Sequence, residues 1–149
     1  MIRSHLPVLL ALTFLSVSSR ADAQAPTREV VALPGATVAP AANFSPGIRA
    51  GNFLFVTGQL GAGADIGSQT TAALESIKRI VEAGGTTMAN VVKCTMFITD
   101  VADYAAMNDA WRPFFPDGAR PARTTVQVAK LLRADGKVEI ECIAFVPPR

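Results

Sequence analysis

The run from Val138 to Val146 limits the possible folds of this chain more than any other feature. It reads Val-Glu-Ile-Glu-Cys-Ile-Ala-Phe-Val, and residues of this kind form strands that are buried on at least one face. A second strand-forming run, Arg120 to Val128, precedes it, and a turn signal at Asp135-Gly136 lies between the two. Two such runs on either side of a turn predict a β-hairpin at the end of the chain.

Two glutamates interrupt the apolar character of the last run. Successive strand side chains point to opposite faces, so Glu139 and Glu141 share one face. A carboxylate in so apolar a strand costs free energy unless it is paired or used in chemistry. Arg123 lies in the other half of the predicted hairpin and is the natural partner. Arg123 and Glu139 are therefore the strongest site candidates, with a structural ion pair at a subunit interface as the alternative. Glu141 is expected to be supporting or interfacial.

The amino-terminal stretch has the layout of a secretory signal peptide. Arg3 precedes an apolar run from Leu6 to Val17, and small residues at alternate positions follow in Ala21-Asp22-Ala23. The apolar run is too short to span a membrane. We expect cleavage after Ala23, with cleavage near Ala25 or an uncleaved anchor as alternatives.

Cleavage would divide the chain into a signal peptide (1–23), a leader with a first strand (24–41) and one domain (42–149). The mature protein is then expected to be periplasmic or secreted, with no membrane attachment once the signal peptide has been removed.

Loss of the signal peptide would also remove the only histidine, His5. Without histidine, Ser-His-Asp catalysis, Cys-His catalysis and histidine-ligated metal sites are excluded. Removing Arg3, Arg20 and Asp22 from the 14 basic and 12 acidic residues leaves a net charge of +1. A near-neutral domain lacks the electrostatic footprint of a nucleic-acid-binding protein, so nucleic acid is not an expected partner.

The two cysteines, Cys94 and Cys142, lie on the apolar face of two predicted strands. The simpler interpretation is a pair of buried thiols that pack as small apolar groups. Because an exported protein meets an oxidising compartment, a disulfide between neighbouring strands is the alternative. The sequence leaves this choice open.

Helical periodicity predicts two helices between the strands. The first is expected over Ser68–Ala83 and is ended by Gly84-Gly85. Asp100 is suited to cap the second helix, and Pro113 should distort its last turn. The second helix carries an aromatic and methionine stripe that we assign to the core: Tyr104, Met107, Trp111 and Phe114.

Further strands are expected at 28–32, 53–57 and 91–99. The resulting order β-β-α-β-α-β-β indicates an α+β domain with one mixed β-sheet and both helices on one face. The uncovered sheet face would mix polar and large apolar groups, and these are Lys93, Thr95, Phe97, Glu139, Glu141, Ile143 and Phe145. Such a face suggests subunit association, with Arg123 and Glu139 meeting a ligand between subunits.

Several segments resemble the reactive intermediate deaminase (RidA/YjgF-type) family. The resemblance covers about Ala42 to Val146 and is highly specific only when its motifs are taken together. The motifs are Gly51-Asn52 leading into Phe55-Val56-Thr57-Gly58-Gln59, the run Asn90 to Asp100, Tyr104 to Asn108, Phe114-Phe115-Pro116, Pro121 to Val126, and Val138 to Ala144.

This resemblance implies a chorismate-mutase-like two-layer fold and a homotrimer with clefts between subunits. It also implies cofactor-free hydrolysis of enamines and imines, such as 2-aminoacrylate, to 2-keto acids and ammonia. Arg123 matches the family arginine that holds the substrate carboxylate, and Glu139 matches the glutamate that positions or activates water. Gly58 and Thr125 match positions that line the cleft, and Asn108 matches a polar residue near it.

Two departures from the family pattern bear on the substrate. The family tyrosine corresponds to Phe44, which keeps the ring and loses the hydroxyl, and the connection from Gly58 to Gln69 is shorter than usual. An imine/enamine hydrolase is therefore the first hypothesis and a non-catalytic, periplasmic binding protein for small carboxylates the alternative. A nuclease role is disfavoured by the near-neutral charge. For Asn108 and Thr125, ordinary helix and strand residues are the structural alternatives.

Overall fold

The computed structural model describes residues 27–35, 43–116, 118 and 120–148, so the predicted signal peptide lies outside the described residues. The helices and strands follow in this order: β1 (Arg28–Val31), β2 (Gly47–Ala50), β3 (Phe53–Leu60), α1 (Ile66–Ala83), the 3-10 helix η1 (Met88–Asn90), β4 (Val91–Ile98), η2 (Val101–Asp103), α2 (Tyr104–Trp111), η3 (Arg112–Phe114), β5 (Ala122–Gln127) and β6 (Val138–Phe145). β2 is a strand that the predicted order lacks, and it turns into β3 at Gly51, whose φ of 57° suits glycine.

The first helix begins slightly earlier than its apolar periodicity predicts. Asp65 caps it, because its Oδ1 accepts from the backbone N–H of Ser68 at 2.8 Å while Ser68 Oγ accepts from the Asp65 N–H at 3.2 Å. This reciprocal capping box satisfies two backbone donors at the start of the helix. The helix ends at Gly84, as predicted.

The second helical region is divided into short pieces. Asp100 caps η2 as expected, with Oδ1 accepting from the Ala102 N–H at 2.9 Å. Pro113 lies in η3, where the α-helix has given way to a 3-10 turn, so the predicted distortion is confirmed.

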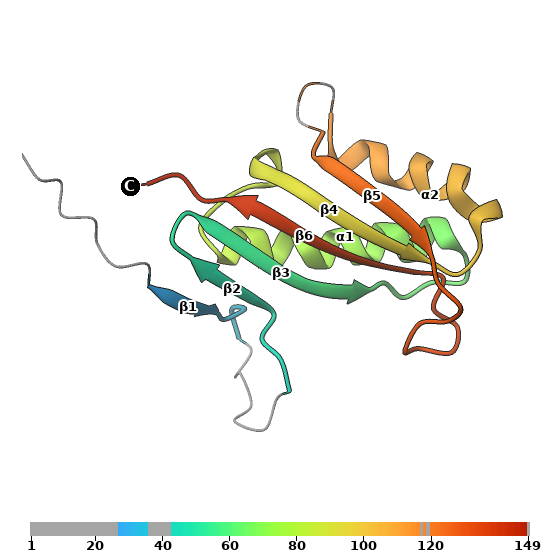
Figure 1. Cartoon of the computed structure of the whole chain (residues 1–149), viewed down its shortest axis with the longest axis horizontal. Helices are drawn as coiled ribbons and strands as arrows, with labels where there is room; N and C mark the ends of the chain where they lie inside the picture. The colour runs from blue at the N-terminus through green and yellow to red at the C-terminus, as the bar shows by residue number, and fades with distance from the viewer. Residues whose placement is uncertain (1–26, 36–42, 117, 119, 149) are drawn as a thin grey trace, which may run out of the picture.

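The strands that the structure describes form one sheet in the order β1-β2-β3-β6-β4-β5. The β4–β5 pair is parallel and the other pairs are antiparallel, so the sheet is mixed, as predicted. In Figure 1 the sheet lies in front and both helices lie behind it. The expected two-layer α+β architecture is confirmed.

The predicted hairpin between the last two strands is wrong. β5 pairs only with β4, and β6 lies between β3 and β4. Segment 128–137 therefore carries the chain past the end of β4 instead of returning it alongside β5. The physical reason is burial: alternate residues of β6 are fully buried, which favours a central position with two neighbours, whereas β5 is largely exposed and suits the sheet edge.

The hydrophobic core lies between the sheet and the helices, and Cys94 and Cys142 are part of it. These cysteines face each other in register on β4 and β6, with Cα atoms 4.1 Å apart, and form a disulfide. The simpler interpretation of two free thiols is wrong, and the alternative drawn from the sequence is the one that the structure contains.

Gln69 is a buried polar residue that joins three segments. Its Nε2 donates to the carbonyls of Gly63 at 3.0 Å and Asp135 at 2.9 Å, and its Oε1 accepts from the N–H of Lys137 at 2.7 Å. The side chain thus holds the loop before α1 against the segment that leads into β6. This contact helps to position the start of β6, the strand that carries Glu139.

The sheet face opposite the helices carries the predicted mixture of polar and apolar side chains. Large apolar groups are half-exposed there, with Phe53 at 45%, Phe55 at 46% and Val126 at 40%. Glu141 is exposed on the same face. Separately, none of the helices in the described ranges is long and apolar enough to cross a membrane.

Candidate active site

Arg123 lies on the helix-covered side of the sheet. It is in register with Cys94, which points into the core, and paired residues on neighbouring strands point to the same face. Its Nη2 donates to the Tyr104 hydroxyl at 3.0 Å. Its Cζ lies 5.0 Å from the Trp111 ring centroid and 5.7 Å from that of Tyr104. Two aromatic side chains of α2 therefore hold the guanidinium through cation–π contacts.

The helix that presents these rings is tied to β5 and to the start of β6. The backbone N–H of Val101 donates to Oε1 of Gln127 at 2.9 Å, and Lys137 Nζ lies 3.2 Å from Oδ2 of Asp103. Both contacts position the beginning of α2, where Tyr104 lies.

A pocket of about 500 Å³ opens beside the guanidinium, and we call it the Arg123 pocket. Its lining residues are Ile98, Val101, Tyr104, Arg123, Thr125 and Gln127. Thr125 Oγ1 is buried and has no hydrogen-bond partner among the described residues. The predicted site residues Arg123 and Thr125 are thus brought together, and the pocket contains a cation, a free hydroxyl oxygen and a phenol.

The prediction that Tyr104 belongs to the core is wrong, because its side chain lines the Arg123 pocket. It is 41% exposed, whereas Met107 and Trp111 of the same stripe are buried and Phe114 is partly buried. The pKa of Tyr104 is lowered, first by a hydrogen bond with the Asn108 side chain and then by the hydrogen bond and charge of Arg123. The predicted residue Asn108 lies one helical turn from Tyr104 and does not itself line the Arg123 pocket.

The sequence spacing could have indicated Tyr104 and Gln127, the polar pocket residues that were not predicted. Tyr104 and Asn108 are four positions apart on one helix, and Gln127 shares the strand face of Arg123 and Thr125 by alternation.

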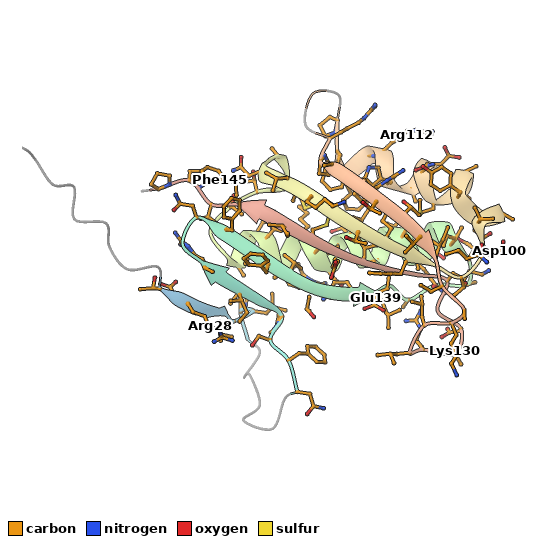
Figure 2. The ribbon with its side chains drawn as sticks, viewed as in Figure 1. Arg28, Asp100, Arg112, Lys130, Glu139 and Phe145 are labelled. Atoms are coloured by element: carbon orange, nitrogen blue, oxygen red, sulfur yellow. A yellow bond between two sulfur atoms is a disulfide. The ribbon has the colours of Figure 1, made fainter. Side chains whose placement is uncertain are left out.

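Glu139 lies on the uncovered sheet face (Figure 2). It is in register with Phe97 of β4 and Leu60 of β3, and it is partly buried. A methyl group at Gly58 would overlap the Glu139 carboxylate oxygen, so a larger residue there would displace the Glu139 side chain. The register of β3 against β6 shifts between Val56 and Gln59, which is the irregularity that brings Gly58 under the carboxylate. The predicted residues Gly58 and Glu139 are therefore in contact.

Arg123 and Glu139 do not meet within one chain. β4 lies between their strands, with Cys94 opposite Arg123 and Phe97 opposite Glu139. Because Cys94 and Phe97 are an odd number of residues apart, their side chains point to opposite faces, and so do those of Arg123 and Glu139. The predicted hairpin does not join their strands, and the expected meeting of the two residues at a ligand between subunits stays a prediction. A site that uses both requires more than one copy of the chain.

Phe44 precedes β2 and is 72% exposed. The carbonyl of Pro46 accepts from the Thr57 N–H at 3.1 Å, so this segment lies beside the end of β3 that carries Gly58. Phe44 does not line the Arg123 pocket.

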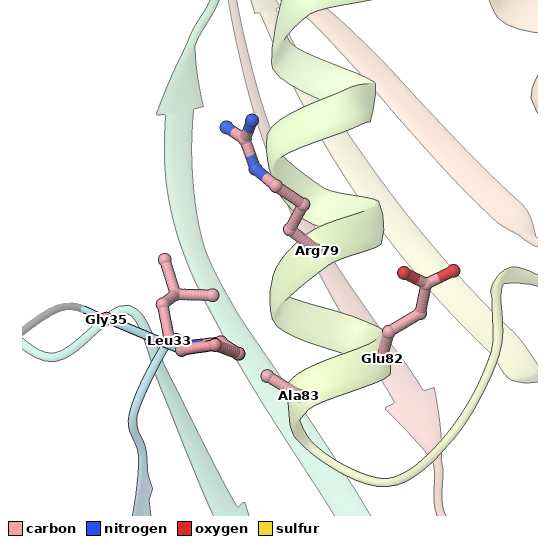
Figure 3. A pocket seen from close by; sticks show the side chains of 6 residues that line it. Leu33, Gly35, Arg79, Glu82 and Ala83 are labelled. Carbon is pink, nitrogen blue, oxygen red and sulfur yellow. The ribbon is translucent and has the colours of Figure 1, made fainter.

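A separate hollow of about 690 Å³ lies between segment 33–35 and the last turns of α1 (Figure 3). Leu33 and Ala83 contribute its apolar wall, and Arg79 and Glu82 are its charged residues. It contains none of the predicted site residues. Within the described ranges no three His, Cys, Asp or Glu side chains are grouped as metal ligands.

Comparison with known proteins identifies the family of this chain. The family model described as Endoribonuclease L-PSP matches residues 35–146, and a RutC family protein of Pyrococcus horikoshii is 39% identical over 114 residues, covering 71% of this chain and 89% of that relative. The chain belongs to the YjgF (endoribonuclease L-PSP) family. The match spans both the Arg123 pocket and the Glu139 side of the molecule.

Solved YjgF-family structures share the fold. Rv2704 from Mycobacterium tuberculosis, a member of the YjgF/YER057c/UK114 family, matches with a TM-score of 0.72 at 31% identity, over 80% of this chain and 100% of that one. NMB1025 from Neisseria meningitidis, a member of the YjgF family, matches with a TM-score of 0.74 at 26% identity, over 84% of this chain and 99% of that one.

Proposed function

We propose that this YjgF-family protein hydrolyses reactive enamines and imines, such as 2-aminoacrylate, 2-iminopropanoate and 2-iminobutanoate, to 2-keto acids and ammonia. The observation that carries the proposal is the Arg123 pocket. Among the described residues the Tyr104 hydroxyl is the one hydrogen-bond acceptor of the guanidinium, which has five N–H donors. The remaining donors suit a bidentate grip on the carboxylate of a small substrate.

Glu139 suits the role of base. As water adds to the imine carbon, the carboxylate takes a proton from that water and returns it to the nitrogen, which gives an adduct with one hydroxyl and one amino group. The carbon–nitrogen bond of the resulting adduct then breaks, nitrogen leaves with the bonding electron pair and a proton, and the adduct hydroxyl loses its proton to form the keto group. The products are a 2-keto acid and ammonia, and no cofactor is needed.

We further propose a homotrimer in which the Arg123 pocket of one subunit faces the Glu139 side of the next. Two observations support this assembly. The two groups lie on opposite faces of one sheet, and the uncovered face offers half-exposed Phe53 and Phe55 for burial against another copy. A sedimentation measurement that gives a monomer at micromolar concentration would contradict it.

The catalytic proposal is tested by ammonia release from imines generated in situ by an amino-acid oxidase. Wild-type protein should accelerate release over buffer. Arg123→Ala should lower kcat/KM by about a hundredfold or more, which corresponds to losing a charge-assisted bidentate contact. Arg79→Ala, which removes an exposed arginine of α1, is the matched control and should behave as wild type. Ammonia release no faster than buffer from the wild type would refute the proposal.

A second candidate is a non-catalytic binding protein for small carboxylates. It is favoured by the fact that the Arg123 pocket is complete in one chain while Glu139 lies on the other face. This function predicts a carboxylate that raises the melting temperature without turnover, and loss of that rise in Arg123→Ala. RNA cleavage, the activity that the family description names, has less support because the described residues contain no histidine and the chain is near neutral.

We also propose that the protein is exported, with residues 1–23 as its signal peptide. The Cys94–Cys142 disulfide supports this proposal, because disulfides persist in oxidising compartments. Mass spectrometry of the protein from the periplasm or medium should find an amino terminus at Gln24, and an intact Met1 there would refute cleavage.

A further inference from the structure

Among the described residues, the Tyr104 hydroxyl accepts a hydrogen bond from Arg123 and donates none. A phenol offers one donor and two acceptor positions. Arg123 Nη2 donates to this oxygen at 3.0 Å, and the Asn108 side chain hydrogen-bonds to it as well. Both interactions lower the pKa of Tyr104. In the part of the chain that the structure describes, no hydrogen bond has the Tyr104 hydroxyl as its donor, so its hydrogen is available to a ligand in the pocket.

This hydroxyl lies in the same pocket as the guanidinium. Tyr104 and Arg123 both line the Arg123 pocket, and Tyr104 is 41% exposed, so a ligand in the pocket can reach it. The ring position does not depend on the hydroxyl alone, because the guanidinium also contacts the rings of Tyr104 and Trp111.

We infer that Tyr104 is the proton donor of this site and that Arg123 brings the ligand to it. The inference rests on the proposed imine hydrolysis. In a 2-imino acid the reacting carbon is bonded to the carboxylate carbon, and the nitrogen is bonded to the reacting carbon. A carboxylate held on Arg123 therefore places that nitrogen within reach of a hydroxyl that is hydrogen-bonded to the same guanidinium.

The proton transfer balances as follows. In the tetrahedral adduct, which carries one hydroxyl and one amino group on the former imine carbon, the carbon–nitrogen bond breaks and its electron pair leaves with nitrogen. Tyr104 gives its phenolic proton to that nitrogen, forming ammonia. The adduct hydroxyl becomes the keto group, and its proton restores the phenol. Arg123 donates to the transient phenolate and stabilises it.

The kinetic test is Tyr104→Phe, which keeps the ring and removes the proton. We expect kcat to fall by about a hundredfold or more while KM stays within about threefold of wild type, because general acid catalysis contributes on this scale. A Tyr104 that merely held Arg123 in place would raise KM instead. Thr71→Val, which removes an exposed hydroxyl on α1, is the matched control and should retain wild-type kinetics. A Tyr104→Phe variant with kcat within threefold of wild type overturns the inference.

A spectroscopic test does not need turnover, because the chain has one tyrosine and one tryptophan. The fluorescence of Trp111, which lies against Arg123, reports pyruvate binding, and the ultraviolet absorbance of tyrosinate reports the titration of Tyr104 alone. Bound pyruvate should raise the Tyr104 pKa by on the order of one unit, because it accepts the phenolic proton and neutralises the nearby charge. Arg123→Ala should abolish this shift.

The outcomes separate the two proposals. A rise of the Tyr104 pKa on pyruvate binding, without ammonia release from imines, refutes imine hydrolysis but keeps Tyr104 as a donor to the bound ligand. Ammonia release by the wild type, with an unchanged kcat in Tyr104→Phe, refutes Tyr104 as the proton donor but keeps imine hydrolysis. If Trp111 fluorescence reports bound pyruvate and the Tyr104 pKa does not change, the inference is overturned. If pyruvate does not bind at all, both the inference and the proposal that Arg123 holds a carboxylate are overturned.

Discussion

Reduction of the Cys94–Cys142 disulfide should lower the free energy of unfolding by about 4 kcal/mol. The two cysteines are separated by 48 positions in the sequence. A crosslink restricts the unfolded chain, and the loop-entropy relation gives about 4 kcal/mol for a loop of this length at 25 °C. Both side chains are almost fully buried in the core, so the folded state has little reason to relax around the bond.

The assay is urea unfolding at a fixed protein concentration, with and without a thiol reductant. The reductant is added while the protein is unfolded and is kept present during refolding and measurement. With ordinary urea sensitivities, a change of this size moves the unfolding midpoint by on the order of 2 M. Cys94→Ala/Cys142→Ala is the matched control. The chain has no other cysteine, so the reductant should leave the midpoint of this variant unchanged. A wild-type midpoint that does not respond to complete reduction would refute the assignment of the stability to the crosslink.

Further predictions concern the supports of the site. Gly58→Ala should displace the Glu139 carboxylate and lower kcat about tenfold to a hundredfold, with Gly67→Ala on α1 as a control that keeps activity. Gln69→Leu leaves two carbonyls and one N–H unpaired and should destabilise the fold by about 3 kcal/mol in urea unfolding; a loss under 1 kcal/mol would contradict its role. The pKa of Asp65 is lowered from 3.8 by the Ser68 backbone hydrogen bond, so the carboxylate stabilises the fold above that pH. The stability difference between wild type and Asp65→Ala should therefore be present at pH 7 and shrink as the pH falls below 3.8; a difference that persists at lower pH would contradict the cap.

The helices could be predicted because their signals are local. The apolar spacing of α1, its glycine stop and the Asp100 cap all depend on residues within a few positions of one another. The same local periodicity cannot tell whether an apolar helix residue packs in the core or lines a pocket. Tyr104 has the spacing of a core residue, and only the neighbouring strand reveals that its hydroxyl contacts Arg123.

The candidate site could be predicted in its residues but not in its arrangement. Gly58 lies against Glu139, and Thr125 shares a pocket with Arg123, as the resemblance to the family implies. The mutual position of Arg123 and Glu139 depends on which strand separates them. A turn signal at Asp135-Gly136 cannot tell whether the chain returns beside β5 or crosses the end of β4.

The sequence by itself determined the local elements, the face on which each strand residue lies, and the shortage of groups for acid–base chemistry that leaves Arg123 and Glu139 as candidates. Only the tertiary structure decided that β6 occupies the centre of the sheet, that Cys94 and Cys142 are bonded, and that Arg123 and Glu139 lie on opposite faces. The physical reason is that alternation and capping act between near neighbours, whereas strand pairing is selected by the burial that a strand gains from partners far away in the sequence.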